Sequence, residues 1–330
     1  MRLRFFIFVA IIFSAVPRVS ISDENPYDFN YSFDNDYPFS VLNDDRAYSG
    51  GQRLSLIRTT DRLPIVFRFL EWFTSNSSQF NSGFALGQQL YTPDDISRRD
   101  PIEDDEPYAA YLSGSFLSYL RNENTLHLFQ VELGVVGPLA LGENIQNAIH
   151  RFIGYRIAEG WDNQLKTEPI LNLFYQQKRT FWALKDAKGV SLSDFVPNAA
   201  IAAGNLYVYG QVGAQFRLGY GLSDDFGPTM TTPMSAEPFV PEQRQPWEAY
   251  GFLAADFRYM VRNLFLDGNT FQTGPRIDKR ALVYDLDFGF LFRYQAFRIA
   301  WRQVLRSQEF QSNLKTHGFG SVLISYTHNF

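Results

Sequence analysis

One run of strict alternation limits the folds open to this chain more than any other feature of the sequence. In residues 206–222, "LYVYGQVGAQFRLGYGL", the even positions are apolar or glycine, whereas Gln211, Gln215 and Arg217 lie among the odd positions. Successive side chains of a strand point to opposite faces. This period of two therefore predicts a β-strand with one apolar and one polar face.

A second run, residues 282–294, repeats the pattern with Asp285, Asp287 and Arg293 opposite an apolar side rich in aromatic residues. The two runs contain about 13 to 17 residues, against ~5–6 for a typical strand. Aromatic residues make up 17% of the chain, with 32 Phe and 18 Tyr. Long strands with an aromatic outer face and a polar interior are typical of a transmembrane barrel, whereas a tightly packed sandwich has little room for so many rings.

About twelve such segments can be counted, an even number, as a closed single-chain barrel requires. The predicted fold class is all-β: a transmembrane antiparallel β-barrel of about twelve strands, with a short helix in an extracellular loop. Residues 64–78, "PIVFRFLEWFTSNSS", interrupt the second and third strands and are predicted to form a periplasmic turn with a short interfacial helix. The predicted strands are residues 27–35, 48–60, 80–91, 108–121, 124–136, 169–181, 190–204, 205–222, 247–262, 280–293, 295–307 and 318–330.

Residues 1–22 carry the features of a signal peptide. Arg2 and Arg4 precede an apolar stretch at residues 5–16, and the small residue Ser22 precedes the expected cleavage point. The apolar stretch has about 12 residues, fewer than the ~20 that a membrane-spanning helix needs. We therefore expect removal of this segment rather than retention as an anchor.

The rest of the chain, residues 23–330, is predicted to be a single outer-membrane barrel. Its last segment, "VLISYTHNF", places Val322, Ile324, Tyr326 and the final Phe330 on one face. A last strand that ends in phenylalanine resembles the signal that outer-membrane barrels present to the barrel assembly machinery. That machinery is an expected partner.

Composition excludes several classes of function. The formal charge of -5 and the lack of a basic cluster do not suit a nucleic-acid partner. The absence of cysteine excludes disulfides, thiolate catalysis, lipoprotein acylation and zinc–cysteine sites.

One connection departs from the strand pattern. Residues 143–164, "ENIQNAIHRFIGYRIAEGWDNQ", have helical spacing, which places Asn147, His150, Arg151 and Gly154 on one side of a helix. If the first strand runs outward from the periplasm, this connection between the fifth and sixth strands is extracellular. Spacing alone leaves His150 open as a catalytic base or a structural loop histidine. It lies amid other polar groups, unlike the remaining histidines: His127, His317 and His328.

A second polar cluster follows the first predicted strand. Asn35 and Asp36 lie at its outer end, and Ser49 lies at the start of the second strand, after an acidic stretch at residues 44–45. Carboxylate and amide oxygens suit calcium, which is a hard cation. An Asn/Asp-rich turn would carry the same residues, so the pattern by itself leaves both interpretations open.

Seven motifs occur in an order that resembles one family, the outer-membrane lipid A 3'-O-deacylases of the LpxR type. All seven lie in the first half of the chain. No single motif is specific, but their common order is improbable by chance. The motifs are "ND" (35–36), "DRAYSGG" (45–51), "LGQQLYTP" (86–93), "PYAAYL" (107–112), "GVVGPLALG" (134–142), "QNAIHRFIG" (146–154) and "GWDNQ" (160–164).

The resemblance implies a calcium-dependent ester hydrolase that removes the 3'-linked acyloxyacyl chain from lipid A in the outer leaflet. Its site would lie between the outer barrel wall and a catalytic loop at about residues 138–168. His150 would be the general base, Asn35 and Asp36 would hold Ca²⁺, and Ser49 stands where the family often has threonine. The implied partners are lipid A, as part of lipopolysaccharide, and the outer membrane.

The sequence departs from the family at one site position. Arg156 stands where the characterised site has a glutamate six residues after the histidine, and Glu159 lies on a different side of the helix. If that carboxylate supports the base, its replacement by Arg156 should lower the hydrolytic activity. Arg151, Arg156 and Lys166 are candidates to bind lipid A phosphates, or face solvent without specificity.

Two alternatives to the deacylase stay open at this point. One is a non-catalytic outer-membrane barrel that binds lipopolysaccharide, and another is a porin, which needs an open lumen. An outer-membrane phospholipase would need a serine–histidine–asparagine set on the outside of the barrel, and the sequence has no motif for one.

Overall fold

The computed structural model describes residues 26–35, 47–60, 64, 67–69, 79–228, 245–312 and 317–328. The predicted signal peptide, Asp36, Phe330 and most of the 64–78 segment lie outside the described residues. Of that segment, residues 67–69 form a short 3-10 turn. Phe67 is buried against the barrel wall, where it stacks on Phe116 with ring centroids 5.4 Å apart.

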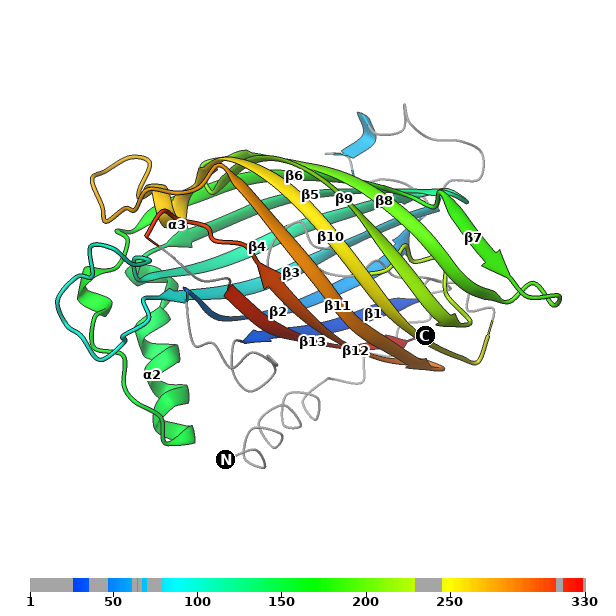
Figure 1. Cartoon of the computed structure of the whole chain (residues 1–330), viewed down its shortest axis with the longest axis horizontal. Coiled ribbons are helices and arrows are strands. Elements are labelled where there is room, and N and C mark those ends of the chain that lie inside the picture. Colours follow the sequence, from blue (N-terminus) through cyan, green and yellow to red (C-terminus); the bar gives the residue numbers. More distant parts are fainter. Residues whose placement is uncertain are drawn as a thin grey trace.

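Twelve of the described strands close into one antiparallel ring (Figure 1). Consecutive strands pair around the ring, β1 pairs with β13, and β6 closes the ring on β8. A thirteenth strand, β7, pairs only with β8 and lies outside the ring. The strands are β1 (Tyr27–Asn35), β2 (Ala47–Thr60), β3 (Gln79–Thr92), β4 (Ala109–Arg121), β5 (Thr125–Val136), β6 (Glu168–Arg179), β7 (Trp182–Lys185), β8 (Ser191–Gly204), β9 (Tyr207–Tyr220), β10 (Trp247–Asn263), β11 (Leu282–Tyr294), β12 (Phe297–Arg306) and β13 (His317–His328).

The predicted barrel is therefore confirmed, and each predicted strand is matched by an observed one within a few residues. Alternation explains the agreement, as β11 illustrates. Its even-numbered residues from Leu282 to Tyr294 are apolar and exposed on the outside, while Asp285, Asp287 and Arg293 are buried inside. Only the four-residue β7 is missing from the prediction, because it is too short to show a period.

Apart from the 3-10 turn at residues 67–69, the described helical elements lie in the connections at one end of the ring, here called the helix end. They are η2 (Pro138–Ala140), α2 (Gly142–Ile153), η3 (Trp161–Asn163) and α3 (Leu264–Asp267). Figure 1 shows α2 projecting beyond the strands at this end. Among the described residues, no helix combines the length and apolar composition needed to cross a membrane.

Charged side chains form ion pairs with one another inside the barrel. Arg306 Nε lies 2.8 Å from Asp285 Oδ1, and Arg258 lies 3.4 Å from the same carboxylate. Arg217 pairs with both Asp194 and Asp225. Buried charges are tolerated when they are paired and hydrogen-bonded, so these pairs make a polar interior compatible with a closed barrel.

Packed aromatic residues fill the interior toward both ends. At the helix end, Phe265 of α3 is fully buried and stacks on Tyr91, with ring centroids 4.0 Å apart. Toward the other end, Phe226 of the β9–β10 connection is buried among Ile57, Leu117 and neighbouring interior side chains. This packing argues against the open lumen that a porin requires.

Candidate active site

The loop that carries α2 leaves and re-enters the barrel at one narrow point. Gly137 follows β5 with φ +93°, and a Cβ there would lie 2.7 Å from the backbone of both Lys166 and Thr167. Only glycine permits this close approach of the two ends of the loop. Gln88 of β3 then donates a hydrogen bond to the Ala140 carbonyl at 2.7 Å, which fixes η2 against the barrel rim.

The start of α2 is anchored on β4 by a second close contact. A Cβ on Gly142 would lie 2.4 Å from that of Ala110 and 2.6 Å from the Trp161 ring. Further along the helix, Gln146 and Asn147 are buried. The buried face of α2 is therefore polar at its centre, and these side chains need hydrogen-bond partners.

The segment after α2 supplies those partners. Gly154 ends the helix with φ 75°, and the chain reverses so that Tyr155 N–H donates to the His150 carbonyl at 2.8 Å. Trp161 Nε1 donates to Gln146 Oε1 at 2.8 Å, and Asn147 bonds to the backbone of Ala158. The helix and its return segment form one hydrogen-bonded unit.

His150 faces this return segment. Its Nδ1 lies 2.5 Å from the carbonyl oxygen of Arg156, and its ring meets the Tyr155 ring edge-on, with centroids 5.1 Å apart. A carbonyl oxygen only accepts hydrogen bonds, so Nδ1 carries the proton. In the neutral ring, Nε2 is then the unprotonated nitrogen, and its lone pair is the one that a general base uses. The side chain is half-exposed.

Asn35 and Ser49 meet at the helix end of the neighbouring strands. Asn35 Nδ2 donates to the Ser49 carbonyl at 3.1 Å, and the Ser49 and Thr92 hydroxyls lie 2.5 Å apart. Ser49 is the extra residue of a β-bulge, because Tyr48 pairs with Tyr91 and Gly50 pairs with Leu90. A bulge re-aims the side chain of its extra residue, here toward Thr92.

Thr92 is a site candidate that the sequence reasoning missed. It is the threonine of the "LGQQLYTP" motif, and the sequence does not assign a role to this residue. Asn35, Ser49 and Thr92 together offer amide and hydroxyl oxygens, which suit calcium. Asp36 follows Asn35 and lies outside the described residues. Within the part of the chain that the structure describes, no group of three acidic or histidine side chains could hold a metal ion.

The three candidate phosphate-binding cations lie on the α2 loop, but described contacts do not join them in a pocket. The side chains of Arg151, Arg156 and Lys166 are exposed. The guanidinium of Arg156 lies 5.9 Å from the centre of the Tyr155 ring. Glu159 is engaged elsewhere, because its carboxylate accepts a hydrogen bond from Arg99 Nε at 2.8 Å.

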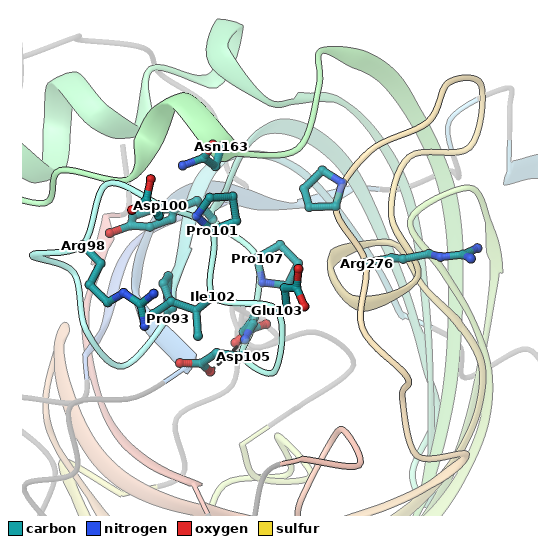
Figure 2. A pocket seen from close by; sticks show the side chains of 13 residues that line it. Pro93, Arg98, Asp100, Pro101, Ile102, Glu103, Asp105, Pro107, Asn163 and Arg276 are labelled. Carbon is teal, nitrogen blue, oxygen red and sulfur yellow. Dashed lines mark hydrogen bonds between the residues drawn. The ribbon is translucent and has the colours of Figure 1, made fainter.

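A cavity of about 250 Å³ lies beside this loop (Figure 2). The β3–β4 connection supplies most of its lining, including Asp100, Glu103 and Glu106, while Asn163 and Arg276 come from neighbouring segments. Glu106 is only 4% exposed. Burial, and then the nearby carboxylates of Glu309 and Asp105, raise the pKa of Glu106 well above its usual value of 4.5.

A family model described as "Outer membrane protein LpxR" matches residues 5–328. The chain belongs to the LpxR family. Among solved structures, LpxR from Salmonella typhimurium is similar with a TM-score of 0.72 and 21% identity, over 91% of this chain and 99% of that one. No curated protein matches the sequence.

Other solved barrels are less similar to this LpxR-family chain. The beta domain of the Bordetella autotransporter BrkA has a TM-score of 0.43 at 8% identity, over 93% of this chain and all (100%) of that one. The translocator domain of NalP from Neisseria meningitidis has a TM-score of 0.40 at 9% identity, over 100% of this chain and 97% of that one.

Membership of the LpxR family confirms the resemblance inferred from the seven motifs, and it makes the protein an outer-membrane barrel. The roles of His150, Asn35, Asp36 and Ser49 stay predictions. Arg156, where the resemblance implies a glutamate, contacts His150 through its main-chain carbonyl.

Proposed function

We propose that the protein is an ester hydrolase that deacylates lipid A, with the 3'-linked acyloxyacyl chain as the leaving acyl group. The observation that carries the proposal is His150, held by its Nδ1 on the Arg156 carbonyl in a loop above the barrel rim. Membership of the LpxR family supports lipid A as the substrate.

In the proposed reaction, His150 Nε2 removes a proton from water, and the resulting hydroxide attacks the ester carbonyl carbon. The tetrahedral intermediate then breaks its bond to the 3'-oxygen of the sugar, and His150 returns the proton to that oxygen. The products are an alcohol on the sugar and a carboxylic acid, which loses its proton to water. No nucleophilic side chain is needed, in keeping with the absence of a Gly-x-Ser-x-Gly motif.

Asn35 and Asp36 are the residues proposed to hold Ca²⁺, with the Ser49 hydroxyl nearby. Calcium, when bound, supplies electrostatic polarisation of the ester carbonyl and of the negative charge that develops on its oxygen. The hydrogen bond from Asn35 Nδ2 to the Ser49 carbonyl directs the amide nitrogen toward β2, which supports a ligand role for the oxygen of the same amide.

We further propose that the helix end faces the cell exterior, where lipid A forms the outer leaflet. Exposed apolar side chains along the strands supply the surface that contacts lipid, and the α2 loop stands beyond them. In this orientation Arg151, Arg156 and Lys166 reach the level of the lipid A phosphates. The last strand, β13, would be presented to the barrel assembly machinery during insertion.

The second candidate is a non-catalytic barrel that binds lipopolysaccharide, favoured by Arg156 in place of the family glutamate. Mass spectrometry of lipid A from cells that express the protein separates the two. The enzyme should produce lipid A that lacks the mass of the 3'-acyloxyacyl group, in calcium-containing medium only. Unchanged lipid A in cells with correctly folded protein would favour the binding function.

A further inference from the structure

Three side chains on one face of α2 bond to the segment that returns along it. Gln146 pairs with Trp161, Asn147 pairs with Ala158, and His150 pairs with Arg156. The order is antiparallel, so each step toward the end of the helix meets an earlier residue of the return segment. The ring of His150 is therefore oriented by the position of the whole segment.

Asn147 controls that position most directly. Its Oδ1 accepts a hydrogen bond from Ala158 N–H at 2.9 Å, and its Nδ2 donates to the Ala158 carbonyl at 3.2 Å. One side chain thus satisfies both backbone groups of a residue only two positions beyond Arg156. Asn147 is 4% exposed, so water cannot readily replace these bonds.

We infer that Asn147 is a positioning residue for His150: it holds the return segment so that the Arg156 carbonyl binds Nδ1 and fixes the ring with Nε2 unprotonated. This inference rests on the proposed function for its catalytic consequence. The carbonyl performs the orienting task that a carboxylate performs in many histidine bases. Any residue at position 156 has that carbonyl, so a glutamate side chain is not required there.

Neither Glu159 nor Tyr155, two other described groups near the ring, offers an equivalent contact. The carboxylate of Glu159 is bound to Arg99, and its backbone N–H donates to the Ile96 carbonyl at 2.8 Å. The Tyr155 ring meets His150 edge-on, which restricts its tilt but does not select a tautomer. Of these contacts, the one between Nδ1 and the Arg156 carbonyl distinguishes the two ring nitrogens.

The tautomer can be measured without reference to activity. We would record ¹⁵N chemical shifts of the histidine rings in the full-length folded barrel in detergent, and assign His150 with His150→Ala. The expected result is a ring protonated at Nδ1 in the wild type and in Arg156→Ala, and a mixture of tautomers in Asn147→Ala. A wild-type ring protonated at Nε2, or an unchanged tautomer in Asn147→Ala, would overturn the inference.

Kinetics then test the catalytic consequence. Asn147→Ala should lower kcat on lipid A about tenfold or more with little change in KM, because misorientation of a base affects the chemical step. Asn144→Ala is the matched control, since Asn144 is an exposed asparagine of the same helix. If Asn147→Ala does not fold, Asn147→Asp keeps the acceptor for Ala158 N–H and should lose a smaller part of kcat. An Asn147 variant with a normal kcat would also overturn the inference.

The two proposals fail in different ways. A wild-type protein with the expected tautomer but no deacylation would refute the proposed function and leave the orienting contact standing. An active enzyme whose His150 ring is protonated at Nε2 would support the proposed function and refute the orienting contact.

Discussion

Lys178 donates hydrogen bonds to the carbonyl oxygens of Phe226, Gly227 and Pro228, at 3.2, 3.0 and 2.6 Å, inside the barrel. One ammonium group thereby holds the start of the β9–β10 connection within the lumen. Asp225 of the same segment adds an ion pair with Arg217 of β9. The segment is fixed by charge as well as by burial of the Phe226 ring.

We predict that the barrel does not conduct ions and that Lys178→Met makes it leak. Methionine fills similar space but leaves three carbonyls without their donor, which should lower the free energy of unfolding by ~3 kcal/mol. Current across planar bilayers is the measurement, with Lys188→Met as the control because Lys188 is exposed. A wild-type protein with steady open-channel current would contradict the plugged lumen.

Calcium should be required for deacylation. Chelation should abolish activity on lipid A and added calcium should restore it, because the proposed ligands Asn35 and Asp36 are hard-oxygen donors. Asn35→Ala should raise the calcium concentration for half-maximal activity at least tenfold. Heat-modifiable migration on gels is the control for folding. Full activity in excess chelator would eliminate the metal.

The β3–β4 connection should be more stable in acid than in base. The raised pKa of Glu106 means that the folded state favours the neutral carboxyl, so its stabilisation is complete below the usual value of 4.5 and is lost as the pH rises through the folded-state pKa. Hydrogen exchange of residues 93–108 measures the effect.

Glu106→Gln removes this ionisation and should protect the connection at pH ~8, by about tenfold for each unit by which the pKa is raised. At pH ~4 it should match the wild type. Glu103→Gln is the control, since Glu103 lines the same cavity but is exposed. Equal exchange in Glu106→Gln and the wild type at pH ~8 would show that ionisation of Glu106 does not destabilise the connection.

The strands were predictable because alternation is a local property of the sequence. Asp285 and Arg293 point inward for the same reason that the even-numbered residues between them point outward, and no distant contact is needed to predict it. The α2 helix was predictable from spacing, and His150 stood out because it is the histidine within that spacing.

The contacts that complete the site could not be predicted in this way. Thr92 meets Ser49 only because a β-bulge shifts the register between β2 and β3. Phe226 and Phe265 enter the lumen from connections with no period, so nothing in their local sequence distinguishes them from exposed loop residues. The contact of the Arg156 carbonyl cannot be predicted from a pattern of side chains, because every residue has a carbonyl group.

His150→Ala should lower the rate of lipid A deacylation by about 10² to 10⁴, the usual contribution of a positioned acid–base group. The barrel should stay folded and heat-modifiable, because His150 lies in a loop outside the strand ladder. A loss of activity in proportion to a loss of folded protein would instead indicate a structural histidine.

Arg156→Glu introduces the glutamate that the resemblance to the LpxR family implies at this position, and it distinguishes the role of the side chain from that of the main chain. If the carbonyl already orients His150, the change should raise kcat by no more than about twofold, because the Nδ1 partner is unchanged. Loss of the guanidinium should raise KM several-fold if Arg156 binds a lipid A phosphate. Steady-state kinetics on purified lipid A distinguish the two effects, and Arg151→Glu tests the neighbouring cation on the same loop. A large gain in kcat in Arg156→Glu would mean that the carboxylate supports the base after all and that the wild-type site is impaired by the arginine.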